Sequence, residues 1–90
     1  MSAAYDVRAT GRVQGVWYRA YVAEQARRQG VTGWVANQPD GSVTGHFEGE
    51  SAAVLALIET CRIGPPKARV DHLEVTPSGT IGAETFEVRR

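Results

Sequence analysis

Apolar and polar residues alternate near the start of the chain. From Tyr5, every second position is apolar or small, and the residues between are polar (Tyr5, Val7, Ala9, Gly11 and Val13 against Asp6, Arg8, Thr10 and Arg12). A period of two is typical of a β-strand that buries one face and leaves the other in water. The pattern therefore predicts a half-buried strand over residues 5–13.

The spacing changes to a helical one over residues 19–29. Apolar residues four apart would share one face of this helix (Tyr18, Val22 and Ala26). Arg27 and Arg28 suit the negative end of a helix dipole, and Gly30 readily takes the left-handed conformation that ends a helix. We expect a helix over residues 19–29 with that face buried.

Two strand-like segments follow, over residues 31–36 and 42–48. The first is rich in β-branched and aromatic residues, and the second alternates in the same way as residues 5–13. Between them, Pro39, Asp40 and Gly41 form a sequence typical of a tight turn, because proline presets φ and glycine accepts a left-handed position. The two segments are predicted to form a hairpin.

A second helix is predicted over residues 51–62, with Ser51 as its N-cap. Its apolar stripe has the spacing i, i+3, i+4, i+7 (Val54, Leu57, Ile58 and Cys61). Gly64 and the two prolines after it end the helix. The stripe predicts a helix that buries one face, with Cys61 as a buried, unreactive thiol.

The last third of the chain predicts a strand over 68–76, a turn-rich segment over 77–83 and a short strand over 85–89. Apolar positions in the first of these strands do not alternate strictly, so a bulge or bend is expected there. The order is strand, helix, strand, strand, helix, strand, with a short strand appended. Two helices on one face of an antiparallel sheet give an α+β ferredoxin-like sandwich, and residues 1–90 are expected to form a single domain.

Composition and charge limit the classes of function. The chain has 90 residues, and ten basic side chains balance ten acidic ones. A net charge of zero argues against a nucleic-acid or membrane-surface binder, and no apolar run is long enough to span a bilayer. Cys61 is the only cysteine and the start of the chain lacks a secretory signal, so we expect a cytoplasmic protein.

The loop from Gly11 to Arg19 is the candidate site for chemistry. A glycine-bearing turn that feeds a helix presents backbone N–H groups that have no partner inside the helix. These donors, the helix dipole and an arginine such as Arg19 together suit a phosphate-sized anion. Without further signals, an ordinary strand-to-helix turn with an exposed arginine explains the loop equally well. Likewise Asn37, taken alone, is a turn residue before Pro39.

Two longer motifs change that balance. The first resembles the Val-Gln-Gly-Val-x-Phe/Tyr-Arg signature of acylphosphatases (Val13-Gln14-Gly15-Val16-Trp17-Tyr18-Arg19). The second resembles the Gly-Trp-Val-x-Asn-x-x-Asp-Gly-x-Val segment of the same family (Gly33-Trp34-Val35-Ala36-Asn37, then Asp40-Gly41-Ser42-Val43). The resemblance covers essentially the whole chain in the right order. Ala36, Gln38 and Trp17 depart from the residues common in the family, and all three flank the site.

The resemblance implies hydrolysis of a carboxyl-phosphate anhydride to a carboxylate and inorganic phosphate, which is also an inhibitor. Arg19 would be the phosphate-binding arginine, and Asn37 would position the attacking water. Backbone N–H groups of the loop would hold the phosphoryl oxygens (Gln14, Gly15, Val16, Trp17 and Tyr18). The family implies a monomer that uses no metal and no organic cofactor. The alternative is a non-catalytic module that binds phosphate or carbamoyl phosphate.

The remaining candidates have structural interpretations. His46 is expected on the solvent face of its strand, and His72 has no identifiable partner, so the two histidines predict no metal site. Tyr18 and Trp34 are expected in the core or in the wall of the site, and Trp17 at the mouth of the pocket. Because a basic field is missing, these aromatic residues do not indicate RNA binding.

Overall fold

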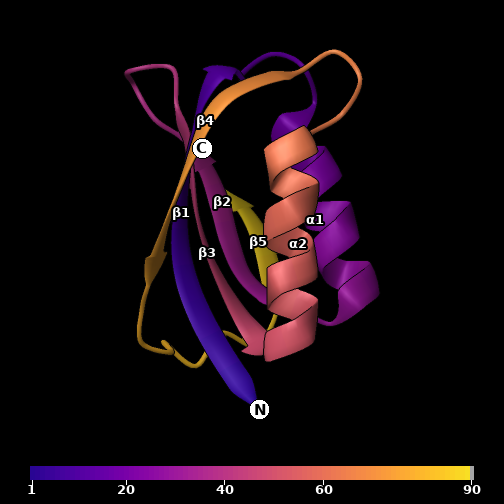
Figure 1. Cartoon of the computed structure of the whole chain (residues 1–90), viewed down its shortest axis with the longest axis vertical. Helices are drawn as coiled ribbons and strands as arrows, with labels where there is room; N and C mark the ends of the chain where they lie inside the picture. Colours follow the sequence, from indigo (N-terminus) through magenta and orange to yellow (C-terminus); the bar gives the residue numbers. More distant parts are fainter. Residues whose placement is uncertain (90) are drawn as a thin grey trace.

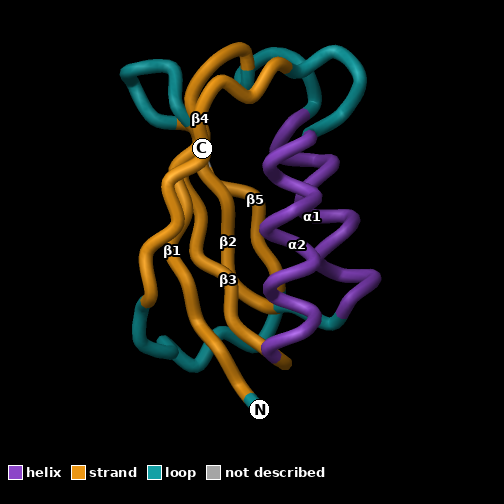
Figure 2. The backbone as a smooth tube through the Cα atoms, viewed as in Figure 1, coloured by secondary structure: helices purple, strands orange, loops and turns teal. Residues whose placement is uncertain are grey.

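The computed structural model describes residues 1–89, and its elements follow the predicted order. Figure 2 shows how they are distributed along the backbone. Their bounds are β1 Ser2–Arg12, α1 Tyr18–Gln29, β2 Thr32–Asn37, β3 Val43–Glu50, α2 Ser51–Ile63, β4 Arg69–Pro77 and β5 Phe86–Arg89. Each differs from its prediction by a few residues at the ends, where strand and helix boundaries are least well specified by periodicity.

The strands form one sheet in the order β4-β1-β3-β2-β5, and both helices lie on the same face of it (Figure 1). β1 pairs antiparallel with β3 and β4, and β2 pairs antiparallel with β3. This arrangement confirms the ferredoxin-like sandwich. The β2–β3 hairpin and the first strand lie side by side although the chain between them includes α1.

The sheet is mixed, which corrects the prediction of an antiparallel sheet. β5 runs parallel to β2, with Val88 opposite Val35 in the register. The reason is topological: β4 runs opposite to β1 at one edge, and the segment after it reverses the chain before β5 reaches the other edge (Figure 1). β5 therefore has the direction of β2, and its neighbour could not be read from the sequence.

The irregularity expected in the fourth strand is present. Thr10 pairs with His72 but Gly11 pairs with Val70, so Asp71 is an extra residue on β4. Gly11 has φ +118°, and a Cβ there would lie 2.3 Å from the carbonyl oxygen of Arg69. Both the φ and the close approach require glycine at this bulge.

The core lies between the helices and the sheet. The predicted helix faces are buried there, together with the inward side chains of the strands (Tyr18, Val22, Ala26, Val54, Leu57, Ile58, Cys61, Val7, Val35 and Phe47). The rings of Phe47 and Phe86 are 5.9 Å apart, which joins the last strand to this core. Of the helices in residues 1–89, none has the length and apolar character needed to cross a bilayer.

The start of α2 differs from the prediction. The helix begins at Ser51 itself, and Glu50 occupies the N-cap position without a side-chain hydrogen bond to the described backbone. The Ser51 amide and hydroxyl instead donate to the carbonyl oxygen of Met1, at 2.7 and 3.0 Å. The amino group of Met1 in turn lies 3.1 Å from the Glu50 carboxylate. A residue 50 positions away thus takes over the capping role that Ser51 was predicted to play.

His46 lies on the sheet face opposite the helices, as its alternation with Phe47 requires, but it is not exposed there. Only 3% of it is accessible, which corrects the expectation of a solvent-facing histidine. Its Nδ1 is 2.6 Å from the Asp6 carboxylate, and its Nε2 is 2.6 Å from the carboxylate of Glu48. Glu48 also accepts hydrogen bonds from the backbone N–H groups of Ile81 and Ala83. The segment between β4 and β5 is therefore held over His46.

In this cluster, hydrogen bonds and burial shift the pKa values of His46 and Glu48 in opposite directions. Burial lowers the pKa of His46, but the hydrogen bonds to Glu48 and Asp6 outweigh burial and raise that pKa above its usual value. Burial raises the pKa of Glu48, but the bonds from His46, Ile81 and Ala83 outweigh it and lower that pKa. These hydrogen bonds therefore favour the protonated form of His46, which lies between two carboxylates.

Candidate active site

The loop between β1 and α1 is anchored by two buried valines. Val13 and Val16 are 1% and 3% exposed, whereas Gly15 between them is exposed. Gly15 has φ +72°, and a Cβ on it would contact nothing within 4 Å, so the backbone conformation rather than space calls for glycine. Trp17 also has a positive φ, 66°, and serves as the N-cap of α1. Such left-handed residues turn successive N–H groups toward one point, which is the geometry of an anion nest.

The first turn of α1 offers positive potential to an anion. Within the described chain, the side chain of Trp17 makes no capping hydrogen bond, and the first turn of α1 contains no acidic residue. The helix dipole at this end is therefore not neutralised by the protein. Tyr18 points into the core, where its hydroxyl donates to the carbonyl oxygen of Cys61 at 2.7 Å. Burial raises the pKa of Tyr18, so this hydroxyl stays protonated and has a structural role.

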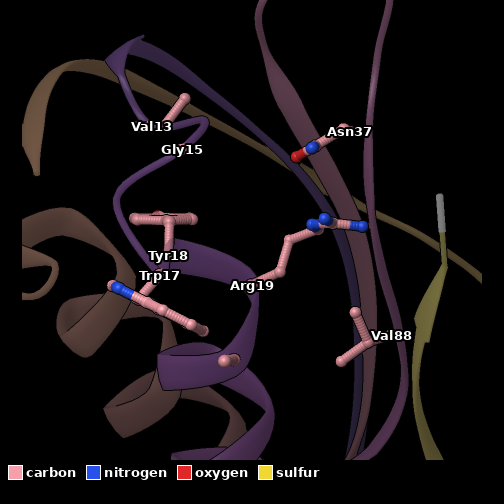
Figure 3. Close-up of a pocket in the computed structure, with 8 residues that line it drawn as sticks. Val13, Gly15, Trp17, Tyr18, Arg19, Asn37 and Val88 are labelled. Atoms are coloured by element: carbon pink, nitrogen blue, oxygen red, sulfur yellow. The ribbon is translucent and has the colours of Figure 1, made fainter.

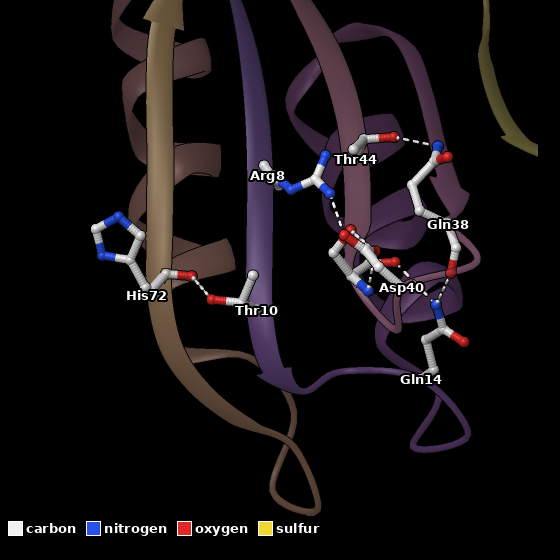
Figure 4. A network of polar contacts seen from close by, with 8 residues as sticks. Arg8, Thr10, Gln14, Gln38, Asp40, Thr44 and His72 are labelled. Atoms are coloured by element: carbon white, nitrogen blue, oxygen red, sulfur yellow. Dashed lines mark hydrogen bonds and ion pairs between the residues drawn. The ribbon is translucent and has the colours of Figure 1, made fainter.

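Gln14 connects the loop to the turn after β2. Its amide Nε2 donates to the carbonyl oxygens of Gln38 and Ser42, at 2.8 and 2.9 Å (Figure 4). The same two residues are joined by the bond from the Gln38 N–H to the Ser42 carbonyl, 2.9 Å. The Gln14 side chain thus holds two segments together that carry different residues of the predicted site.

The turn itself is stabilised by Asp40. Its Oδ1 accepts the Ser42 N–H at 3.0 Å and the Ser42 hydroxyl at 2.6 Å, and its other oxygen pairs with Arg8 of β1 (Figure 4). These bonds, those from Ser42 first, lower the pKa of Asp40 to about 2. The turn that follows Asn37 is therefore held in one conformation and against β1.

Arg19 lies in the first turn of α1 and reaches the C-terminal strand. Its Nη1 donates to the carbonyl oxygen of Arg89 at 2.6 Å. A guanidinium has five N–H donors in a planar fork, so this bond, the one that its side chain makes within residues 1–89, orients the group and leaves donors for an anion. The Arg89 side chain is turned elsewhere, since its guanidinium carbon lies 4.9 Å from the ring centre of Trp34.

Asn37 is the last residue of β2 and pairs with Val43 of β3. Its side-chain oxygen, Oδ1, is buried and makes no hydrogen bond to any of the described residues. A buried polar atom without a partner is rare in folded proteins, because its desolvation is not compensated. Figure 3 shows the amide turned toward the space beside the Arg19 guanidinium.

Arg19 and Asn37 line the same cavity, which has a volume of about 370 Å³. Eight residues line it (Val13, Gly15, Trp17, Tyr18, Arg19, Ala20, Asn37 and Val88). The structure thus brings together Arg19, Asn37 and part of the predicted loop. Gln14 and Val16 are not among the lining residues of the described chain; the first ties the loop down and the second anchors it in the core. Trp17 is 77% exposed at the mouth, as expected.

Sequence reasoning missed Val88 in this cavity. It reaches the site because β5 is parallel to β2, and no local pattern indicates which edge of the sheet β5 joins. Trp34, expected in the core or the wall, is half-exposed on the other face of the sheet beside Arg89.

Cys61 is 1% exposed and burial raises its pKa to about 12, in agreement with an inert thiol. His72 is exposed. Residues 1–89 contain no group of three or more His, Cys, Asp or Glu side chains arranged to hold a metal ion.

Comparison with known proteins adds independent information. The acylphosphatase family model matches residues 5–88. An acylphosphatase of Anaeromyxobacter dehalogenans is 54% identical over 83 residues, which cover 89% of this chain and 87% of that protein. One from a Nocardioides strain is 46% identical over 89 residues, which are 99% of this chain and 90% of the relative.

The fold comparison agrees. The crystal structure of acylphosphatase from Bacillus subtilis superposes with a TM-score of 0.92 and 34% identity, and 98% of each chain is covered. An acylphosphatase from Coxiella burnetii superposes with a TM-score of 0.93 at 32% identity, covering 98% of this chain and 93% of that one. Family model, sequence and structure coincide over nearly the whole length, and the chain is a hydrolase that belongs to the acylphosphatase family.

Proposed function

We propose that the cavity between the β1–α1 loop, β2 and β5 hydrolyses acyl phosphates. In this proposal, Arg19 and the backbone N–H groups of residues 14–18 bind the phosphoryl group, and Asn37 orients the attacking water. One observation supports the proposal most strongly: Asn37 lines the same cavity as Arg19, and its buried Oδ1 has no hydrogen-bond partner among residues 1–89. An amide oxygen without a protein partner is available to accept a hydrogen bond from a water molecule.

The reaction demands little beyond binding and alignment. The oxygen of water forms a bond to phosphorus, and the bond between phosphorus and the acyl oxygen breaks. The carboxylate leaves with the electron pair of that bond, and because the pKa of its acid is about 4, it needs no proton from a general acid. One proton of the water passes to a phosphate oxygen, and the other stays on the oxygen that is now bound to phosphorus. What remains for the protein is to neutralise the phosphoryl charge and align the water.

The proposed division of labour fits the chemistry of both side chains. A guanidinium can hold two phosphoryl oxygens at once, and the free end of the helix dipole adds to its positive potential. The amide of Asn37 is not a base, but its oxygen can accept a hydrogen bond from water and so fix the direction of attack. One chain supplies Arg19, Asn37 and the loop, so the proposed mechanism needs no residue from a second copy.

The role of Arg19 is tested with acetyl phosphate in the presence of a metal chelator. We expect Arg19→Ala to lower kcat/KM by a factor of about 100 or more, which is about 3 kcal/mol of transition-state stabilisation, and to weaken inhibition by inorganic phosphate. Arg28→Ala is the matched control, because Arg28 lies at the far end of the same helix in an exposed pair with Glu24. Phosphate inhibition that is unchanged in Arg19→Ala would refute the binding role.

The role of Asn37 is tested by the split between kcat and binding. Asn37→Ala should lose at least about 100-fold in kcat while the inhibition constant of phosphate stays within a few-fold of wild type. Retained turnover would refute the positioning role. If wild type binds phosphate but does not accelerate hydrolysis at all, the alternative of a phosphate- or carbamoyl-phosphate-binding module is the correct one.

A further inference from the structure

Charge is distributed unevenly between the two ends of the molecule, although the whole chain has a net charge of zero. At one end, which we call the site end, β1 and β2 finish, α1 begins and the cavity opens (top of Figure 1). At the far end, α1 and β3 finish and α2 begins. The position of a charge relative to these two ends decides its effect on an anion that approaches the cavity.

Most of the basic side chains are paired with a carboxylate. Ion pairs of this kind join Arg8 to Asp40, Arg28 to Glu24, Arg62 to Glu59, Arg69 to Asp71 and Arg89 to Glu87. The basic side chains that pair with no carboxylate of residues 1–89 are Arg12, Arg19, Arg27 and Lys67. Because the field of a close ion pair largely cancels at a distance, the unpaired bases contribute most of the positive field.

Three of these unpaired bases lie at the site end. Arg19 lines the cavity itself. Arg12 is the last residue of β1, is exposed, and directly precedes Val13, which also lines the cavity. Lys67 is exposed in the loop that leads from α2 to β4, at the same end. Arg27, in the last turn of α1, is the exception.

The loop that carries Lys67 packs against the wall of the cavity. The Ala68 N–H donates to the carbonyl oxygen of Pro65 at 3.0 Å, which closes a turn around Lys67. A Cβ on Gly64, the residue before this turn, would lie 3.3 Å from the ring of Tyr18. Because Tyr18 lines the cavity, Lys67 lies near the cavity without being one of its lining residues.

The unpaired carboxylates have the opposite distribution. Within residues 1–89, the carboxylates that contact no basic group are Glu74 and Glu84. Glu74 is near the middle of β4, and Glu84 precedes β5 at the far end. Neither lines the cavity. The described part of the chain therefore surrounds its anion-binding loop with a positive field, and this field adds to the dipole of α1.

We propose that Arg12 and Lys67 attract the anionic acyl phosphate to the cavity and so raise kcat/KM, although neither residue lines the cavity. The inference rests on the proposed function. No contact with the substrate is required, because a charge acts over several ångströms of water. A unit charge roughly 10 Å from a dianion changes the local concentration of the dianion about threefold at 0.01 M salt. At about 0.5 M salt the screening length is only about 4 Å, and the effect disappears.

The test is kcat/KM for acetyl phosphate, measured with the full chain at ionic strengths from about 0.01 to 0.5 M. Lys67→Glu should lower kcat/KM about three- to fivefold at the lowest ionic strength, with kcat unchanged, and should match wild type at the highest. Arg12→Gln removes one charge and should lower kcat/KM about twofold under the same conditions. Arg28→Glu is the matched control, because it makes the same change in net charge as Lys67→Glu but lies at the far end. Its effect should stay below about 1.5-fold.

The outcomes separate this inference from the proposed function. Equal losses in Lys67→Glu and Arg28→Glu would show that net charge alone matters and would overturn the inference. A loss in Lys67→Glu that persists at about 0.5 M salt overturns it too, because a field would be screened. If wild type does not hydrolyse acetyl phosphate, the proposed function fails. The dissociation constant of inorganic phosphate, measured by calorimetry over the same salt series, then decides the inference by the same criteria, and no phosphate binding overturns it. A loss confined to Lys67→Glu and Arg12→Gln that salt abolishes supports it.

Discussion

The buried cluster under the segment between β4 and β5 leads to a prediction about stability. Replacing Glu48 by alanine removes a carboxylate whose side chain is 7% exposed and that accepts three hydrogen bonds. These come from His46 at 2.6 Å and from the N–H groups of Ile81 and Ala83, at 2.8 and 2.9 Å. In the variant, Asp6 is the carboxylate that still contacts the buried His46 ring within residues 1–89.

The expected loss follows from what happens to each donor. Breaking a buried ion pair by removing one partner typically costs about 3–5 kcal/mol. The two N–H groups lie in a segment where Ile81 is 61% exposed, so they can recover bonds to water and add little to the loss. We therefore expect Glu48→Ala to lower the free energy of unfolding by about 3 kcal/mol, a large share of the roughly 5–15 kcal/mol typical of a domain.

Urea unfolding followed by circular dichroism measures this loss. Glu59→Ala is the matched control, because that carboxylate is 68% exposed and pairs with Arg62 on the surface of α2. It should change the free energy of unfolding by less than about 0.5 kcal/mol. A loss below about 1 kcal/mol in Glu48→Ala, with the Ile81 amide still protected from hydrogen exchange, would refute the reasoning.

The pH dependence of stability gives a second readout of the same cluster. The pKa of His46 is raised on folding, so its contribution is fully present below its unfolded value near 6.5 and is lost as pH rises through the higher folded value. The pKa of Glu48 is lowered, so its contribution is present above about 4.5 and is lost as pH falls through the lower folded value. Stability should therefore be highest between about pH 4.5 and 6.5. His46→Gln should remove the decline that His46 causes on the alkaline side, and a decline of unchanged size would contradict its assignment to this cluster.

Three further predictions concern the loop, the hairpin and the thiol. Gln14→Ala removes two hydrogen bonds and should lower the free energy of unfolding by about 1–2 kcal/mol and kcat/KM for acetyl phosphate by about tenfold; wild-type values in both assays would contradict its tethering role. Gly33→Ala would place a Cβ 1.8 Å from the His46 carbonyl oxygen, and thermal unfolding should show a free energy of unfolding lowered by about 3 kcal/mol or more. Gly41→Ala is the control: its Cβ would contact nothing within 4 Å, so the loss should be about 1 kcal/mol. Equal effects of the two would refute the steric argument. Cys61 should resist a thiol reagent in the native state at pH 8 and react fully in urea, because burial raises its pKa to about 12; fast native labelling would show that α2 opens readily.

Local patterns predicted most of the fold, and the failures share one cause. The alternation in β1 and the stripe of α2 predict which faces are buried, since each face follows from the backbone period alone. The period of two also placed His46 on the correct side of the sheet. It could not predict that Asp6, Glu48 and a segment from another part of the chain would cover it. Ser51 is likewise a residue type favoured at N-caps, but its N–H and hydroxyl donate to the Met1 carbonyl oxygen instead.

The candidate site likewise has residues that the sequence predicted and contacts that it did not. Arg19 and Asn37 were identified through motifs around them, and their separation in the chain contains no information about distance. Gln14 was predicted as part of the loop backbone, and no pattern indicated that its side chain bonds to the turn after Asn37. Val88 was predicted to lie on one face of a short strand, and its place in the cavity was not predicted.

The sequence by itself determined the order of the elements, the buried faces of both helices, the tight turn at Asp40 and the two motifs that indicate phosphate chemistry. These depend on residues close together in the chain, where the backbone period and turn conformations act directly. Only the tertiary structure decided that β5 joins β2 in parallel, which brings Val88 and the Arg89 carbonyl to Arg19. It also decided that His46 is buried between the carboxylates of Asp6 and Glu48. Both results depend on contacts between residues tens of positions apart. The free energy that brings these residues together comes from packing of the whole sheet, because no local backbone preference specifies such contacts.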